Sequence, residues 1–316
     1  MKILFFGTPD FACPALKKVV KAGHDVLAVV CQPDRPKGRG RKLVSPPVKQ
    51  KAINLGLPVL QPESLKDNEA IKLLKSYSVD IGIVVAYGLM IPDAILDLPQ
   101  HGFINIHPSL LPKYRGSSPI QTALANGDTK TGVCVMKVTS QMDEGAVYHC
   151  TEMAIADEHD YGVFHDRLSE QGAEDLVNVL SAFQNNGSCT SIEQDEKNAT
   201  YCKKIQKEDT VIDWSGSARE IHNQVRSLSP HPGAMTMYQE QAFKIYQTQV
   251  MEEVSVSGNI GQVIAIHKNK GFEVVTGEGH LLVTVVQLQG SRRMSAQDFV
   301  NGQGAEVLNL SLRGGA

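Results

Sequence analysis

The chain has 316 residues, of which 42% are hydrophobic and 21% are charged, and its formal net charge is −3 at pH 7. This composition is typical of a globular protein with about two domains, and it carries no global signal for nucleic-acid or membrane binding. Because the apolar run Ile3 to Phe6 is too short for a signal peptide and no stretch approaches the roughly 20 apolar residues of a membrane helix, we expect a cytoplasmic protein without an anchor.

The first half of the chain alternates between patterns typical of strands and of helices. Apolar runs rich in β-branched residues predict buried strands, and segments with apolar residues at helical spacing separate them. The predicted strands are residues 2–7, 24–32, 79–88, 102–108, 131–139 and 146–156, and the predicted helices are 11–23, 68–78, 91–99 and 160–183. This alternation predicts a parallel sheet covered by helices on both faces, with its functional site beyond the C-terminal ends of the strands.

The second half of the chain has a different pattern. Residues 187–208 are polar and have no sustained apolar period, which indicates a linker. A short helix is predicted at 217–229, and short alternating runs separated by glycines and polar turns follow it. Such runs are typical of a small antiparallel barrel or sandwich, in which we expect the lone Trp214 to be a packing anchor.

The cysteine and histidine residues predict no metal site. The six cysteines contain no C-x-x-C pair, and the ten histidines show none of the spacings that bind zinc. In a long chain without an export signal, we expect the cysteines to be reduced thiols.

The predicted strand that ends at His107 carries the first candidate site residues. Because side chains alternate along a strand, Asn105 and His107 share one face, and Ile104 and Ile106 share the other. A carboxamide and an imidazole at a strand end suit acyl transfer, because both can stabilise the oxyanion of a tetrahedral intermediate. A neutral imidazole can also accept a proton from an attacking amine. The alternative is that both are ordinary polar residues satisfied by hydrogen bonds at a strand end.

Asp143 is the second candidate, because a working histidine usually has an orienting carboxylate. It lies in the short connection SQMDEG between two apolar runs. The alternative is that it is only a turn residue, because Asp-x-Gly is common turn chemistry. Nothing local in the sequence places Asp143 next to His107.

Residues 32–51 form the third candidate site, a basic loop after the second predicted strand. The loop contains seven Lys or Arg residues and one Asp, with Gly38 and Gly40 on either side of Arg39. A basic loop with glycines at this edge of the sheet suits binding to a phosphate backbone, and we expect it to be mobile until phosphates neutralise its charge. The alternative is a solvated surface loop.

Three common fingerprints are absent from the sequence, namely G-x-G-x-x-G, G-x-x-x-x-G-K-[ST] and G-x-S-x-G. Their absence argues against a dinucleotide-binding dehydrogenase and a serine hydrolase.

A series of motifs resembles a known family. The motifs, in this order from about residue 3 to residue 300, are FFGTPDFA, QPDRPKGRG, VVAYG, INIHPSLLPKYRG, MDEG and IDWS…VRSLSPHPGA. INIHPSLLPKYRG by itself resembles the wider group of enzymes that use 10-formyltetrahydrofolate. Together the motifs closely resemble the methionyl-tRNA formyltransferase family.

The resemblance implies an architecture and a reaction. The architecture is an α/β fold with a doubly wound, Rossmann-like formyltransferase domain at 1–186, a linker at 187–208 and an OB-like β-barrel that binds tRNA at 209–316. The reaction is transfer of the formyl group from 10-formyltetrahydrofolate to the amino group of methionine on initiator tRNA, for translation initiation. We expect the folate to be a co-substrate, no cofactor to be bound permanently, and the protein to be a monomer.

The resemblance also implies roles for individual residues. Asn105, His107 and Asp143 would be catalytic, and Arg39 would meet the acceptor end of the tRNA. The folate contacts would come from the turn after the strand, at Ser109, Leu110, Leu111 and Pro112. Small departures from the family pattern occur at Ser117, Ser118 and Glu144.

Two rival functions remain at this level. A sister enzyme that formylates a small amine, such as a glycinamide nucleotide or an amino sugar, would share the site but would need neither the basic loop nor the C-terminal barrel. A non-catalytic RNA-binding protein on the same scaffold would not need Asn105, His107 and Asp143 together.

Overall fold

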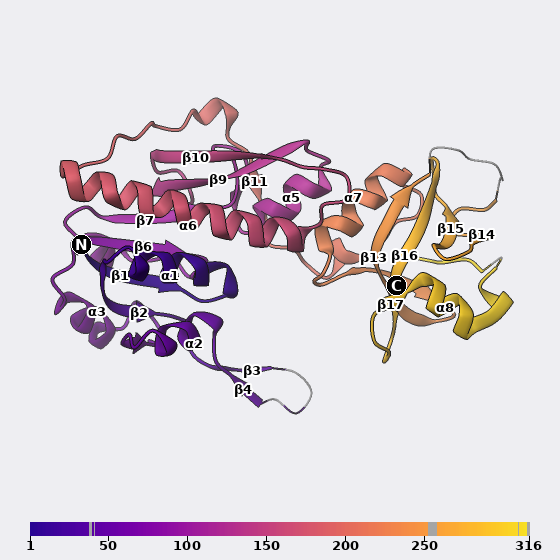
Figure 1. Ribbon diagram of the computed structural model, residues 1–316, viewed down its shortest axis with the longest axis horizontal. Helices are drawn as coiled ribbons and strands as arrows, with labels where there is room; N and C mark the ends of the chain where they lie inside the picture. Colours follow the sequence, from indigo (N-terminus) through magenta and orange to yellow (C-terminus); the bar gives the residue numbers. More distant parts are fainter. Residues whose placement is uncertain (38–39, 41, 252–257, 309, 315–316) are drawn as a thin grey trace. The chain divides into compact units, whose positions relative to one another are not determined.

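The chain divides into two units, each with its own sheet (Figure 1). The computed structural model describes residues 1–37, 40, 42–251, 258–308 and 310–314. Unit 1 comprises Met1–Pro119, Lys130–Met153 and His165–Cys202, and unit 2 comprises Ile120–Thr129, Ala154–Phe164 and Lys203–Ala316. Segments 120–129 and 154–164 therefore belong with the second unit, although they precede the end of the first.

Unit 1 is built on a seven-stranded sheet. Its strands are β1 (Lys2–Gly7), β2 (Asp25–Val30), β5 (Val59–Leu60), β6 (Ile81–Val85), β7 (Phe103–His107), β9 (Lys130–Lys137) and β10 (Val147–Ala154), in the spatial order β10-β9-β7-β6-β1-β2-β5. The five strands from β7 to β5 in this order are parallel, as predicted, whereas β9 runs antiparallel to β7. The chain order reverses between β1 and β6, so the C-terminal ends of these strands flank a topological switch point, where α/β sheets bind their ligands.

Helices cover both faces of this sheet (Figure 1), which confirms the predicted doubly wound α/β architecture. The helices and 3-10 turns are η1 (Asp10–Ala12), α1 (Cys13–Lys21), α2 (Pro47–Asn54), α3 (Asn68–Lys75), α4 (Asp93–Leu96), α6 (Tyr161–Asn186) and η2 (Glu196–Asn198). On one face, Phe6 of β1 packs with Leu74 of α3 and Ile95 of α4. On the other face, α6 lies so close to β7 that a Cβ atom at Gly172 would overlap Ile106.

The segment after α6 stays with unit 1 as far as Cys202. Ile192 forms an antiparallel bridge with Val147, and β11 (Tyr201–Cys202) pairs in parallel with β8 (Arg115–Gly116). Residues 187–202 of the predicted linker are therefore attached to unit 1 at two points.

An antiparallel sheet forms the centre of unit 2, as predicted for the second half of the chain. Its strands are β12 (Ala234–Tyr238), β13 (Gln241–Val250), β14 (Val263–His267), β15 (Gly271–Val275), β16 (His280–Leu288) and β17 (Met294–Ser295). The accompanying helices and turns are α5 (Pro119–Ala125), η3 (Glu208–Thr210), α7 (Ala218–Leu228), α8 (Ala296–Gln303) and η4 (Gly304–Val307). Trp214 is buried and donates its Nε1–H to Thr236 Oγ1 at 3.0 Å, so it is the packing anchor that was expected. Across the described residues of both units, no helix is long and apolar enough to cross a membrane.

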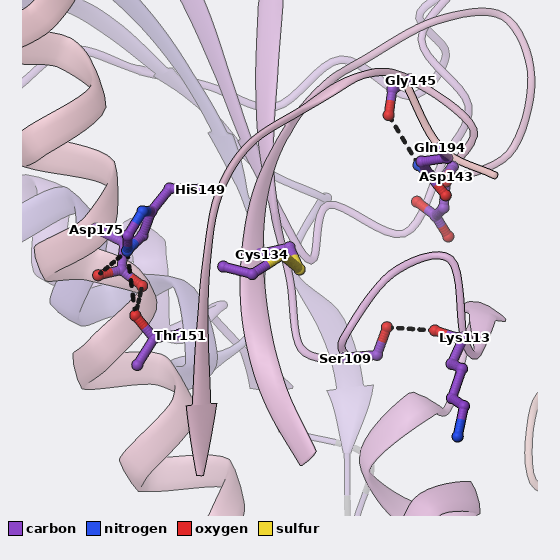
Figure 2. The surroundings of a disulfide bond; sticks show 10 residues. Ser109, Lys113, Cys134, Asp143, Gly145, His149, Thr151, Asp175 and Gln194 are labelled. Carbon is purple, nitrogen blue, oxygen red and sulfur yellow. Dashed lines mark hydrogen bonds and ion pairs between the residues drawn. A yellow bond between two sulfur atoms is a disulfide. The ribbon is translucent and has the colours of Figure 1, made fainter. Parts of the chain in front are cut away.

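Two of the six cysteines form a disulfide bond (Figure 2). Cys134 of β9 and Cys150 of β10 are joined, and their Cα atoms are 4.1 Å apart. The expectation that all six cysteines are reduced thiols is wrong for this pair. The spacing along the chain did not reveal it, because the two residues become neighbours only when β9 and β10 lie side by side in the sheet.

A buried carboxylate lies between two histidines in the sheet of unit 2. Glu273 is 4% exposed, and its two oxygens accept hydrogen bonds of 2.7 Å each from His267 Nε2 and His280 Nδ1. Burial alone raises the pKa of Glu273, but the two histidines outweigh burial, so its pKa lies below the usual value. Because the folded-state pKa is lowered, the carboxylate stabilises the fold above the ordinary glutamate pKa of about 4.3. That contribution is lost as the pH falls through the lowered pKa.

We expect Glu273→Gln to lower the free energy of unfolding by about 1–3 kcal/mol at neutral pH, because an amide cannot accept both hydrogen bonds. The difference from the parent protein should shrink as the pH falls from about 5 to about 3, which urea denaturation at each pH measures. Glu240→Gln is the matched control, because Glu240 is exposed and its side chain has no partner within the described ranges. A difference that stays constant over this pH range would contradict the account.

Candidate active site

Strand β7 carries Asn105 and His107 to the C-terminal edge of the sheet. Ile104 and Ile106 are buried on one face, and alternation places Asn105 and His107 on the other. His107 is 3% exposed, whereas Asn105 is only partly buried. In the part of the chain that the structure describes, the Asn105 carboxamide has no hydrogen-bond partner. It is therefore available to bind a ligand.

A hydrogen bond to the backbone determines which ring nitrogen of His107 carries a proton. His107 Nε2 lies 2.9 Å from the carbonyl oxygen of Tyr114, and because a carbonyl oxygen can only accept, Nε2 must donate. The other ring nitrogen, Nδ1, lies 3.6 Å from Asp143 Oδ2. Nδ1 is therefore the ring atom that can gain or lose a proton, and it faces a carboxylate.

Asp143 lies in the turn between β9 and β10. Its Oδ2 atom accepts a hydrogen bond of 2.8 Å from the backbone N–H of Gly116. Its backbone φ angle is 55°, in the left-handed region that side chains disfavour. The structure thus brings Asp143 to His107, although no local feature of the sequence places the two side chains together.

The turn after β7 holds the four residues expected to contact folate, Ser109, Leu110, Leu111 and Pro112. Ser109 is fully buried, and its hydroxyl donates to the carbonyl oxygen of Lys113 at 2.6 Å (Figure 2). Leu110 packs tightly against β9, because a Cβ atom at Gly132 would overlap its side chain. The Ser109 side chain thus stabilises the turn itself, and folate contact by these four residues stays a prediction.

A cavity of about 570 Å³ lies at the same edge of the sheet. Its lining comes from the loops that follow β1, β2 and β6 and from the basic segment beyond β2. Ala86 belongs to the lining and lies two residues beyond Val84, which pairs with Asn105, so the cavity and the end of β7 share one edge of the sheet. The cavity therefore offers room for a substrate at the edge of the sheet to which β7 also brings Asn105 and His107, although neither residue lines it.

The basic loop is a hairpin where the structure describes it, with β3 (Arg35–Lys37) paired antiparallel to β4 (Lys42–Val44). Asp34 lies at its base and accepts hydrogen bonds from Lys49 and Gln61. These two hydrogen bonds hold the pKa of Asp34 below its usual range, and the bond from Lys49 contributes most. Arg39, the residue expected to meet tRNA, lies outside the described residues, and so does most of the loop tip.

Two residues that stabilise this site are marked by no pattern in the sequence. Arg115 is fully buried, although the sequence shows it only as a single basic residue after a turn. Gln194 lies in the segment predicted to be a linker, yet its Nε2 donates to the carbonyl oxygens of Asp143 and Gly145 at 2.8 Å each (Figure 2). No pattern could reveal these contacts, because a polar residue in an irregular segment has no periodicity that identifies its partner.

Gly145 allows the Asp143 turn to pack closely on β9. A Cβ atom at this position would overlap the carbonyl oxygen of Lys137. We expect Gly145→Ala to lower the free energy of unfolding by about 1–3 kcal/mol, measured by urea denaturation, because the turn backbone must shift. The same substitution at Gly302 of α8 is the control, because the space around Gly302 is open. Gly302→Ala should be neutral or stabilise by up to about 1 kcal/mol, and equal effects of the two substitutions would refute the packing argument.

The chain is similar to known formyl transferases over nearly its whole length. Residues 1–180 match the family model described as formyl transferase, and residues 204–304 match formyl transferase, C-terminal domain. The chain is 41% identical over 303 residues to a methionyl-tRNA formyltransferase of Sulfurihydrogenibium sp. (strain YO3AOP1), with 96% of this chain and 97% of the relative covered. It is 44% identical over 308 residues to a methionyl-tRNA formyltransferase of Marinobacter nauticus, with 98% of each chain covered.

A solved structure shares the fold at lower sequence identity. WlaRD, a sugar 3N-formyl transferase crystallised in the presence of dTDP and 5-N-formyl-THF, has a TM-score of 0.65 and 18% identity. The match covers 92% of this chain and 99% of that one. At this identity the likeness shows the fold alone, whereas the relatives above 40% identity extend over nearly the whole chain. The chain belongs to the methionyl-tRNA formyltransferase family.

Proposed function

We propose that the protein transfers the formyl group of 10-formyltetrahydrofolate to the amino group of methionine on initiator tRNA, for translation initiation. The observation that carries the proposal is that Asp143 lies 3.6 Å from Nδ1 of His107, on the strand that also carries Asn105, at the sheet edge that has a cavity and a basic hairpin. The names of relatives that match nearly the whole chain support the tRNA substrate. A folate-type donor is supported by the sugar formyl transferase of the same fold, which was crystallised with 5-N-formyl-THF.

The proposed reaction needs an oxyanion stabiliser and a group that moves protons. When the methionyl amine attacks the formyl carbon, negative charge develops on the formyl oxygen, and N10 of the folate must be protonated as it leaves. Asn105 would donate its free N–H to the formyl oxygen. His107 would take up the amine proton at Nδ1 and pass a proton to N10, because its Nε2 is occupied by the carbonyl oxygen of Tyr114.

Asp143 would stabilise the charge that His107 acquires. Its Oδ2 atom lies 3.6 Å from Nδ1, and an imidazolium ion formed by protonation of Nδ1 would have a carboxylate next to it. The hydrogen bond from the Gly116 N–H keeps that oxygen in place. Asp143 would therefore act on the proton transfer and not on substrate binding.

A small-amine formyltransferase is the nearest rival, because a sugar formyl transferase has the same fold. That likeness comes with 18% identity, whereas the tRNA-specific relatives share 41–44%. A small amine also gives no reason for a basic hairpin at the cavity. A non-catalytic RNA-binding protein would not need a carboxylate beside the imidazole of His107, on the strand that carries Asn105.

The assay that tests the proposal mixes the purified protein with 10-formyltetrahydrofolate and charged methionyl-tRNA, and detects N-formylmethionyl-tRNA. Parallel reactions offer an amino sugar nucleotide or a glycinamide nucleotide as the acceptor. Formylation of the tRNA supports the proposal. Formylation of only a small amine, or of none of these acceptors, would overturn it.

We expect Asn105→Ala and His107→Ala each to lower kcat by about 100–1,000-fold, because each removes a group that stabilises the transition state. The formyl transfer assay measures the loss, and urea denaturation confirms that each variant is folded. Asn68→Ala is the matched control, because Asn68 is an exposed residue at the start of α3. Wild-type turnover in a folded Asn105→Ala or His107→Ala variant would remove that residue from the mechanism.

Arg39 is expected to bind the acceptor end of the tRNA, since flanking glycines let the backbone approach RNA closely. We expect Arg39→Ala to weaken tRNA affinity about tenfold, the loss of one charge-assisted hydrogen bond, while folate binding stays nearly unchanged. Affinity should also fall less steeply with salt than in the parent protein. Lys75→Ala in α3 is the control, because it removes an exposed charge elsewhere in unit 1. Unchanged binding and formylation in Arg39→Ala would leave the loop as a solvated surface segment.

A further inference from the structure

The segment 192–202, which we name the clamp segment, crosses the turn that carries Asp143. At one end, Ile192 exchanges both backbone hydrogen bonds with Val147, at 2.8 and 2.9 Å. At the other end, β11 pairs with β8, so closely that a Cβ atom at Gly116 would overlap the carbonyl oxygen of Cys202. The segment is therefore fixed at both ends, and its middle is held over the Asp143 turn.

Gln194 is the residue of the clamp segment that contacts this turn. Its Nε2 carries two N–H groups, and each donates to one backbone carbonyl oxygen, of Asp143 and of Gly145 (Figure 2). Its Oε1 atom accepts from Arg115 Nε at 3.0 Å. Because a guanidinium group only donates and a carbonyl oxygen only accepts, these partners allow one orientation of the amide. The two carbonyl groups lie on either side of Glu144, so Gln194 fixes the direction of the turn backbone.

Arg115 holds the side chain of Gln194 in place through this hydrogen bond. It is fully buried, and its guanidinium makes a two-point contact with Glu196, at 2.6 Å for Nη2–Oε1 and 3.0 Å for Nη1–Oε2. A further hydrogen bond of 3.3 Å joins Nη1 to the hydroxyl of Tyr201. The Glu196 contact raises the pKa of Arg115 above its usual value, so the buried group stays charged. Three residues of the clamp segment thus share one buried cation.

Residues 114–116, at and just before β8, also hold both members of the His107–Asp143 pair. The carbonyl oxygen of Tyr114 accepts from His107 Nε2, and the N–H of Gly116 donates to Asp143 Oδ2. Arg115 lies between these two residues and points to the clamp segment. Three consecutive residues therefore connect the histidine, the carboxylate and the segment that fixes the carboxylate's turn.

We propose that Gln194 is a positioning residue for formyl transfer, which holds the Asp143 turn so that the carboxylate faces His107 Nδ1. The inference rests on the proposed function. Asp143 adopts a left-handed backbone conformation, which aspartate tolerates better than most residues but which still costs free energy, so hydrogen bonds to the turn help to maintain it. Gln194 supplies two of them through the backbone on either side of Glu144. It acts through Asp143 and does not contact the reacting atoms.

The first test compares Gln194→Ala with Gln171→Ala. Gln171 lies in α6 of the same unit, and its side-chain amide also donates a hydrogen bond, to Asp175. Gln194→Ala should lower kcat for methionyl-tRNA formylation by about 10–100-fold, because a small displacement of a proton-transfer group is amplified in the rate. KM for the folate and for the tRNA should stay within about twofold, and Gln171→Ala should match the parent protein. An unchanged kcat for Gln194→Ala, or a loss confined to KM, would overturn the proposal.

The second variant, Gln194→Glu, separates the two contacts of Gln194. A glutamate at this position keeps an oxygen that can accept from Arg115. It has no N–H group to donate to the carbonyl oxygens of Asp143 and Gly145, and places a carboxylate next to them instead. Its kcat should fall at least as far as that of Gln194→Ala. If Gln194→Ala does not fold, Gln194→Glu replaces it in every comparison, because its contact with Arg115 is retained. Wild-type kcat in Gln194→Glu would overturn the proposal.

A double-mutant cycle distinguishes positioning from a general loss of structure. Asp143→Asn should change the pH dependence of kcat, and Gln194→Ala should change it in the same direction. In the Asp143→Asn background, Gln194→Ala should lower kcat no further, because its partner in the mechanism is already gone. Additive losses would overturn the proposal. If the parent protein forms no N-formylmethionyl-tRNA, the proposed function fails; if it does and Gln194→Ala is unaffected, only this inference fails.

Discussion

The hydrogen bond from His107 Nε2 to the carbonyl oxygen of Tyr114 decides how the candidate site can work. It commits one ring nitrogen to the backbone, so that proton exchange is left to Nδ1, which faces Asp143. The orientation of the ring therefore depends on where residues 114–116 run, and this path depends on their pairing with β11. The orientation of the His107 ring thus depends on a segment almost a hundred residues further along the chain.

The network of hydrogen bonds that connects residues 114–116 with the segment 192–202 contains a buried charged residue. Arg115 is fully buried, and a buried cation is tolerated only with close, hydrogen-bonded partners, which Glu196, Gln194 and Tyr201 supply. Loss of Glu196 would remove the closest compensating charge, and loss of Gln194 or Tyr201 would leave a buried N–H donor without that partner. The same network reaches the Asp143 turn through the two hydrogen bonds that Gln194 donates to the carbonyl oxygens of Asp143 and Gly145.

The regular elements of both units follow from local patterns. Strand β7, helix α6 and the antiparallel sheet of unit 2 were predicted, because apolar periodicity repeats over neighbouring residues. Local patterns did not predict the antiparallel direction of β9 or the Cys134–Cys150 bond, because both depend on which strands become neighbours. The hairpin at the base of the basic loop was read only as a loop, since its strands are three residues long.

The sequence by itself determined that Asn105 and His107 share a face at a strand end, because side chains alternate along a strand. It also determined the family, because the motifs occur in order along nearly the whole chain. Only the tertiary structure decided that Asp143 lies beside His107 and that Arg115 is buried. It also decided that Gln194 donates hydrogen bonds to the Asp143 turn. These contacts join residues far apart in irregular segments, where no local periodicity or steric rule identifies a partner. Their geometry exists only once β7, β8, the Asp143 turn and the clamp segment are packed together.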